Sequence, residues 1–237
     1  MLWRVINYAE YDAAWNMALD EAILEEYIAG HVPPTIRFYG WRKPSVTIGR
    51  LQPVSSVPEG WGTNIVRRPT GGRAVAHGQD LTFSLVVAAS ILGSPVRESY
   101  RRVGEAVSRA LGSIGVPAEL CRTTTPPASV RGIGNCFDLT LDYELSVEGR
   151  KTLGSAQVRR SGAVLQQNSL ANPAGQPWPE CERLVKAIVK EIGAEFGVEM
   201  VFREITEPEL KLARSLTDNK YACDGWNLNG TVQDDAQ

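Results

Sequence analysis

The chain has 237 residues, 43% of them hydrophobic, and a formal net charge of −2 at pH 7. This charge gives no reason to expect nucleic-acid binding, and no apolar run approaches the roughly 18 residues that a membrane span needs. The first residues lack a signal-peptide pattern, so we expect a cytoplasmic protein with no membrane partner. Four cysteines without Cys-x-x-Cys spacing, and only two histidines, predict neither a disulfide framework nor a metal site.

A helix is predicted to run from Asp12, as its cap, to between Glu26 and Ala29, with Gly30 as its end. Its apolar residues recur at helical spacing, and Glu21 falls near the middle of that stripe. Burying a lone carboxylate is costly, so we expect Glu21 to form a structural salt bridge, for which the arginines of residues 67–73 are available partners. A direct ligand role for Glu21 remains the alternative.

Further elements follow in chain order. Strands are predicted at residues 35–41, 45–50, 64–66, 80–87 and 143–147, and helices at residues 95–114, 182–196 and from the capping-box pattern at 206–209. Residues 123–129, rich in Thr and Pro, are expected to form a mobile loop. Strands and helices alternate without a strict βαβ repeat, which favours an α/β (α+β) fold with a mixed sheet flanked by helices. We expect one domain over 1–237, without a separate accessory C-terminal domain.

The most informative stretch is residues 67–77, which holds three arginines, a threonine, two adjacent glycines and one of the two histidines. Adjacent glycines let the backbone approach a ligand closely, and the free N–H groups of such a turn can bind an anion or a polarised carbonyl. A tight hairpin with solvent-facing arginines explains the same residues. The motif alone leaves both interpretations open.

Other segments complete a recognisable pattern. Residues 15–21 (Trp-Asn-Met-Ala-Leu-Asp-Glu), 134–138 (Gly-Asn-Cys-Phe-Asp), 151–157 (Lys-Thr-Leu-Gly-Ser-Ala-Gln) and 220–227 (Lys-Tyr-Ala-Cys-Asp-Gly-Trp-Asn) join the arginine–glycine loop. Together they resemble the lipoate ligase and octanoyltransferase family, whose fold is shared with biotin protein ligases. The cysteine before Phe-Asp, with Lys-x-x-Gly-Ser-Ala after it, is most similar to the cysteine-dependent octanoyltransferases.

The resemblance implies roles for individual residues. Cys136 would be the nucleophile, and Lys151 would favour its thiolate and polarise the thioester carbonyl. Their proximity rests on the resemblance, because a simple hairpin turning at residues 148–149 places Cys136 opposite Ser161. His77 is expected to line the pocket wall. The small side chains at residues 154–156 (Gly-Ser-Ala) would leave room for a narrow tunnel that holds an acyl chain. The substrate-binding residues are then Arg68, Thr70, Gly71, Gly72, Arg73, His77, Gly154, Ser155 and Ala156.

The resemblance also implies partners. The donor would be octanoyl-acyl carrier protein and the acceptor a lysine of a lipoyl-domain protein, such as the glycine cleavage H protein, in lipoate biosynthesis. No cofactor is required, because a thioester is already activated. Three alternatives remain: an ATP-dependent lipoate ligase, an amidotransferase between lipoyl-domain proteins, and a non-catalytic acyl-binding module. Arg50 favours the ligase, whereas Pro53 and Arg73 favour the transferase.

Overall fold

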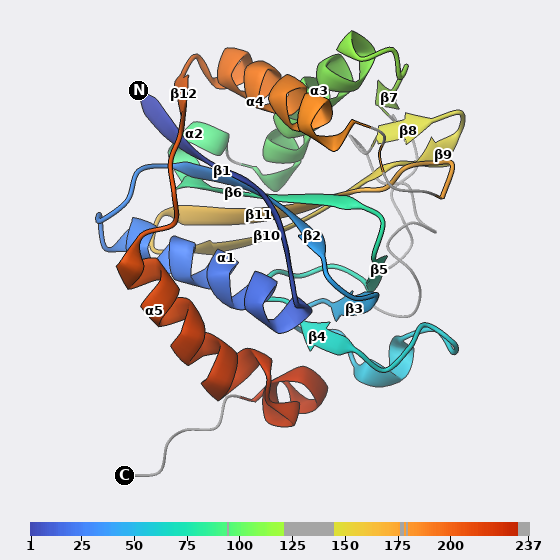
Figure 1. The fold of residues 1–237 in the computed structure, drawn as a ribbon, viewed down its shortest axis with the longest axis vertical. Helices are drawn as coiled ribbons and strands as arrows, with labels where there is room; N and C mark the ends of the chain where they lie inside the picture. Colours follow the sequence, from blue (N-terminus) through green and yellow to red (C-terminus); the bar gives the residue numbers. More distant parts are fainter. Residues whose placement is uncertain (94, 121–144, 176–177, 179, 232–237) are drawn as a thin grey trace.

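Six strands form the central sheet of the computed structural model, which describes residues 1–93, 95–120, 145–175, 178 and 180–231 (Figure 1). Their order across the sheet is β10-β11-β6-β2-β1-β12. The strands span Leu2–Tyr11 (β1), Thr35–Trp41 (β2), Leu81–Ala88 (β6), Leu153–Arg160 (β10), Ala163–Leu170 (β11) and Glu199–Phe202 (β12). β1 runs parallel to β2 and β12, while β2, β6, β11 and β10 are successively antiparallel, so the predicted mixed sheet is confirmed.

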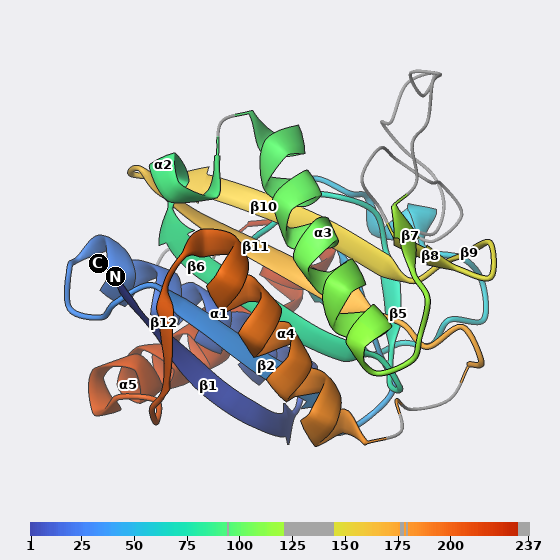
Figure 2. The same ribbon diagram turned by 90° about the horizontal axis from the view of Figure 1, so that it is seen from above.

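Helices cover both faces of this sheet (Figures 1 and 2). Helices α3 (Val96–Ser113) and α4 (Cys181–Phe196) pack on one face through one apolar core, whose members include Val107 and Ile188. On the other face α1 (Ala13–Ile28) and α5 (Glu207–Leu216) share a second core. A short helix α2 (Ala89–Leu92) follows β6. Within the described parts of the chain, no helix is both long and apolar enough to cross a membrane.

Two small sheets flank the central one. The first has the order β4-β3-β5, and the second β7-β8-β9. Their strands are Ser45–Ile48 (β3), Ile65–Arg67 (β4), Val75–His77 (β5), Glu119–Leu120 (β7), Leu145–Val147 (β8) and Arg150–Lys151 (β9). Helical turns at Val54–Ser56, Thr217–Tyr221 and Gly225–Asn229 complete the described elements. The β8–β9 hairpin pairs Ser146 with Lys151 and turns at residues 148–149, as predicted.

Most predicted elements are present, with small differences at their ends. The strand predicted over 45–50 stops at Ile48, because the Arg50 backbone N–H instead donates to the carbonyl of Thr70 at 2.8 Å. Asp12 precedes α1 as predicted but makes no side-chain capping bond. The capping box of α5 is confirmed: the Thr206 hydroxyl and the Glu209 carboxylate each accept from the other's backbone N–H. The loop predicted at 123–129 lies outside the described residues.

Candidate active site

A pocket with an empty volume of about 400 Å³, part of it open to solvent, lies where β10, β11, β6 and β2 of the central sheet face β3 and β5. Six of the predicted binding residues line it: Arg68, Gly72, His77, Gly154, Ser155 and Ala156. The side chains of Met17, Trp41 and Val75 form an apolar part of the pocket lining. The remaining lining residues, which the sequence analysis did not select, are Tyr39, Thr47, Thr82, Gln167, Asn168 and Ser169.

The glycine loop at residues 70–72 is held against the end of β3 by a very close backbone approach. A Cβ added at Gly49 would lie only 2.0 Å from the carbonyl oxygen of Gly72, so only glycine fits there. Gly72 itself has φ of 91°, a conformation that other residues rarely adopt. The loop therefore owes its position to a glycine that precedes it by more than twenty residues.

Both arginines at the start of the motif point inward, which contradicts the alternative of a tight hairpin with solvent-facing arginines. Arg67 is only 3% exposed. Its guanidinium donates to six backbone carbonyls at 2.7 to 3.2 Å, those of Gly49, Arg50, Gln52, Trp226, Asn227 and Leu228. Burial, with the positive charge of Arg50 nearby, lowers the pKa of Arg67. Arg67 thus joins the residues after β3 to the turn after α5 and is not placed to bind an anion.

Arg68 shapes the loop from the other side. Its Nη2 atom donates to the carbonyl oxygens of Gly71 at 2.8 Å and Arg73 at 2.9 Å, while Nη1 donates to the Thr47 hydroxyl at 2.8 Å. Because Arg68 also lines the pocket, it fixes the loop and contributes to the wall at once. A guanidinium suits this task, since its donors have a fixed planar arrangement.

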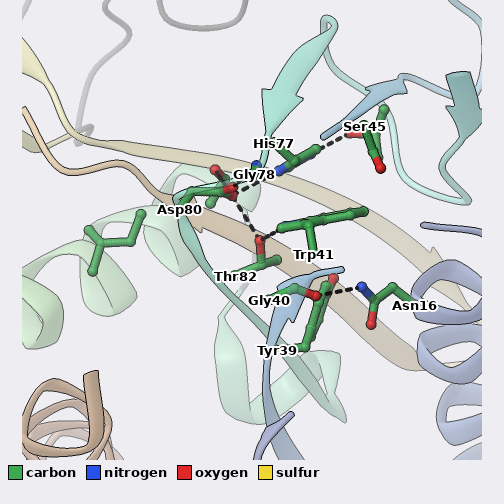
Figure 3. Close-up of polar contacts among 12 residues, drawn as sticks. Asn16, Tyr39, Gly40, Trp41, Ser45, His77, Gly78, Asp80 and Thr82 are labelled. Atoms are coloured by element: carbon green, nitrogen blue, oxygen red, sulfur yellow. Dashed lines mark hydrogen bonds and ion pairs between the residues drawn. The ribbon is translucent and has the colours of Figure 1, made fainter. Parts of the chain in front are cut away.

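His77 sits at the centre of a polar chain along the pocket wall (Figure 3). Its Nδ1 lies 2.8 Å from the Asp80 carboxylate and its Nε2 lies 2.8 Å from the Thr47 hydroxyl. The ring stacks on the indole of Trp41, with centroids 3.9 Å apart. The Asp80 carboxylate also accepts from the Thr82 hydroxyl at 2.9 Å. With both ring nitrogens engaged, His77 is held in the pocket wall, where it was expected to lie; its contact with a substrate stays a prediction.

Asp80 stays ionised in this environment. Burial alone would raise the pKa of its carboxyl group, but the facing His77 and hydrogen bonds from His77, Ser169 and the Gly78 N–H together lower that pKa to about 2. Because an ionised carboxylate can only accept a hydrogen bond, Asp80 favours the proton on Nδ1 of His77, the nitrogen that faces it.

A second polar cluster, which the sequence analysis missed, lies beneath the pocket around Asp20. Its fully buried carboxylate accepts hydrogen bonds from Arg37 at 2.7 Å, and from Tyr39, Ser84 and Gln167 at 2.8 Å. Burial, and then the negative charge of Asp20, raise the pKa of Tyr39 well above its usual value. Gln167 in turn accepts from the Thr70 hydroxyl at 2.8 Å, which connects the core to the glycine loop.

Three predicted binding residues do not line the pocket. Thr70 is fully buried and turned toward Gln167, and Gly71 contributes a carbonyl to Arg68 rather than a surface to a ligand. Arg73 lies partly buried just beyond the loop, its carbonyl also bonded to Arg68. Their contribution in the structure is to hold the loop, so a direct contact with substrate stays a prediction for these three.

Glu21 forms the expected structural salt bridge, but not with an arginine of residues 67–73. Its carboxylate lies 2.6 Å from the Lys220 ammonium and 2.7 Å from the Tyr221 hydroxyl, with Arg160 3.8 Å away. The partner comes from the turn after α5, because α5 packs along α1. The predicted arginine partner was wrong, because the guanidinium groups of Arg67 and Arg68 are hydrogen-bonded to backbone carbonyls and to Thr47.

Lys151, the predicted partner of the nucleophile, lies partly buried in β9. Lys151 ends β9, and residues 154–156 lie in β10, because Thr152 separates the two strands. Thr152 is fully buried: its N–H donates to Leu145 at 2.7 Å, and its carbonyl accepts from Ala171 at 2.8 Å. The backbone after Lys151 is thus fixed by two hydrogen bonds of Thr152, and Lys151 itself pairs with Ser146, three residues before the pocket wall. Cys136 lies outside the described residues.

Comparison with known proteins agrees with this geometry. Residues 12–173 match the model of the lipoyl protein ligase A/B catalytic domain. The chain belongs to this family. It is 34% identical to the octanoyltransferase LipM of Symbiobacterium thermophilum over 95% of this chain and 98% of that one. The octanoyltransferase LipM of Bacillus subtilis is 32% identical over 95% of this chain and 97% of its own.

The fold is shared with solved structures. A putative lipoate protein ligase from Thermoplasma acidophilum, solved with bound lipoic acid, superposes with a TM-score of 0.81 at 25% identity, covering 97% of this chain and 99% of that one. The predicted lipoate ligase fold is therefore confirmed. The relatives named octanoyltransferase confirm the predicted enzyme class, an acyltransferase. The individual catalytic and binding roles remain predictions.

Proposed function

We propose that this chain is an octanoyltransferase of lipoate biosynthesis that works through an acyl-cysteine intermediate in the cytoplasm. The observation that carries the proposal is the pocket itself, whose far wall is built from the small residues Gly154, Ser155 and Ala156 and begins three residues after Lys151. An eight-carbon chain buried there would gain about 0.8 kcal/mol for each methylene removed from water.

The reaction has two acyl transfers. The Cys136 thiolate attacks the carbonyl carbon of the donor thioester; a new carbon–sulfur bond forms and the donor leaves as a thiolate. The amine of an acceptor lysine, after losing its proton, then attacks the acyl-cysteine; a carbon–nitrogen bond forms and the Cys136 thiolate is released. Lys151, as an ammonium, favours the Cys136 thiolate before acylation and again as the thiolate is released. It also hydrogen-bonds the thioester carbonyl oxygen as negative charge develops there.

The proposed donor is octanoyl-acyl carrier protein and the proposed acceptor is a lipoyl-domain protein; the relatives' name, octanoyltransferase, supports the octanoyl group as the group transferred. Incubation with octanoyl-acyl carrier protein should add one octanoyl group to Cys136, detected by intact mass and peptide mapping. Cys136→Ser should abolish the adduct and the transfer. Lys151→Ala should slow both steps, and Lys151→Arg should rescue poorly, because a guanidinium does not replace the compact ammonium. Native transfer rates in Cys136→Ser would disprove this mechanism.

The second candidate is an ATP-dependent lipoate ligase, favoured by the solved Thermoplasma structures and by Arg50. Arg50 stacks on Trp226, with its guanidinium carbon 4.4 Å from the ring centroid, a contact that needs no nucleotide. If the chain is a transferase, free octanoate with ATP and magnesium should give no modified lipoyl domain. ATP-dependent modification that survives Cys136→Ala would establish the ligase instead. Replacing the donor by an octanoylated lipoyl-domain protein tests the amidotransferase alternative in the same assay.

A further inference from the structure

Two large apolar side chains lie exposed next to the glycine loop. Leu51 is 89% exposed and Leu228 is 46% exposed. Their backbones are joined through one guanidinium: Arg67 donates to the carbonyl of Arg50, the residue before Leu51, and to that of Leu228, both at 3.2 Å. Single exposed leucines are ordinary, but two whose backbone segments are tied to one buried arginine, beside the glycine loop, are less so. We call Arg50, Leu51 and Leu228 the loop-side rim.

The rim also carries unbalanced positive charge. Arg50 is partly exposed, and among the described residues no carboxylate or hydrogen-bond acceptor is paired with its guanidinium. The Lys220 ammonium lies over the same Trp226 ring, 4.0 Å from its centroid. Burial, and then the charges of Arg160 and Arg50, lower the pKa of Lys220 against the opposing effect of Glu21. Lys220 is paired with Glu21 at 2.6 Å and Arg160 is paired with Glu25, so the unbalanced charge of the rim is that of Arg50.

The rim is continuous with the pocket wall. Gly49, which precedes Arg50, presses on Gly72 so closely that a Cβ would lie 2.0 Å from its carbonyl oxygen. Gly72 lines the pocket, and the Arg50 N–H donates to Thr70 in the same loop. Figure 1 shows the turns after α5 lying beside β4, whose last residue, Arg67, donates to the carbonyls of Asn227 and Leu228. A protein bound to the rim would therefore be separated from the pocket only by the backbone of the glycine loop.

We propose that the loop-side rim docks the lipoyl-domain acceptor, with acidic side chains of the acceptor against Arg50 and an apolar side chain against Leu51 and Leu228. This inference rests on the proposed function. The acceptor delivers its amine on a four-carbon side chain, so its folded surface must touch the edge of the pocket. A donor that carries its acyl group on a long prosthetic arm has no such requirement. Arginine beside exposed apolar residues is also the composition typical of protein interfaces.

The test combines binding and kinetics. The variants are Leu51→Ser, Leu228→Ser and Arg50→Glu, and the matched controls are Leu2→Ser and Arg203→Glu. Leu2 is 42% exposed and lies at the start of β1, whereas the residues of β1 that pair with Tyr39 and Trp41 of the pocket lie at its other end. Arg203 is an exposed cation near the same end of β1 as Leu2. Calorimetry with the unmodified lipoyl domain gives Kd without any turnover. Steady-state transfer gives KM and kcat for the acceptor.

We expect each rim variant to raise Kd and KM at least fivefold while kcat at saturating acceptor changes less than twofold, and the controls to change neither. Arg50→Glu should also flatten the salt dependence of binding, because it removes the charge that attracts the acceptor. Unchanged Kd in all three rim variants, with wild-type transfer intact, would overturn the docking inference alone. Slower acylation of the enzyme by octanoyl-acyl carrier protein, with acceptor Kd unchanged, would assign the rim to the donor and also overturn it. Wild-type binding through the rim without any octanoyl transfer would instead refute the proposed function.

Discussion

The substitution Gly49→Ala tests whether one backbone contact sets the shape of the pocket. A Cβ at Gly49 would lie 2.0 Å from the carbonyl oxygen of Gly72 and 3.1 Å from the carbonyl carbon of Gly71, where ordinary contacts begin at 3.4 Å. Because the obstacle is backbone rather than a flexible side chain, the glycine loop must move by more than 1 Å. That movement draws the Gly71 carbonyl away from Arg68, whose Nη2 now lies 2.8 Å from it.

The expected cost follows from these two effects. Overpacking typically costs about 1–3 kcal/mol, and a weakened hydrogen bond to a charged group adds about 1 kcal/mol, so we expect a loss of about 2–4 kcal/mol in the free energy of unfolding. For a chain of this length that is a fall of roughly 4–16 °C in Tm. Displacement of Gly72, which lines the pocket, should also raise the KM for the octanoyl donor.

The control is the same chemical change in an open position. Gly112 lies exposed in α3, with no atom within 4 Å of an added Cβ, so Gly112→Ala should stabilise the protein by about 0.5–1 kcal/mol through helix propensity. Thermal unfolding and donor kinetics on both variants decide the matter. If Gly49→Ala has the Tm and the donor KM of the wild type, the close approach does not hold the loop and the reasoning fails.

Three further outcomes are expected. Asp20→Asn should lower the free energy of unfolding by about 3–5 kcal/mol in urea titrations, because it leaves the buried guanidinium of Arg37 without its counter-charge; a loss below 1 kcal/mol would contradict the assigned pair. Thr206→Ala should cost about 1 kcal/mol in the same assay through loss of the capping box, with no change in transfer kinetics. The pKa of Asp80 is about 2 when folded against about 3.9 unfolded, so its contribution, about 2–3 kcal/mol, is present above pH 4 and is lost as the pH falls toward 2. Urea titrations from pH 7 to pH 2 should therefore show a steeper acid loss in the wild type than in Asp80→Asn, and equal slopes would count against the His77 contact.

The regular elements were predictable because periodicity reports burial directly. The stripe of α4 and the capping residues of α5 need only local sequence, and both are present where they were expected. The mixed sheet was also inferable from the order of elements. What these patterns do not contain is which distant segments meet, and most of the pocket depends on that.

The buried polar residues show where local reasoning ends. Asp20 stands beside Glu21 in an apolar helix, and the two carboxylates look equivalent in the sequence. In the structure Asp20 faces the sheet and binds Arg37, whereas Glu21 faces the turn after α5. Gln167 lies in a strand whose polar run, residues 166–169, would read as exposed, yet every residue of β11 is buried. An unbroken polar run in a strand flanked on both sides is the signal that was available and not used.

The two adjacent arginines have separate tasks, and this changes what the motif means. Arg67 ends β4 and Arg68 follows it, so their side chains leave the chain in different directions. Arg67 binds carbonyls beyond β3 and after α5, and Arg68 binds Thr47 and the carbonyls of the loop. Lysine, with a single ammonium, could not span such a set of acceptors. Both guanidinium groups bind the protein's own carbonyls, Arg68 those of the glycine loop and Arg67 those after β3 and after α5. The arginine pair therefore has a structural task, and Cys136 and Lys151 stay the predicted source of the chemistry at the pocket.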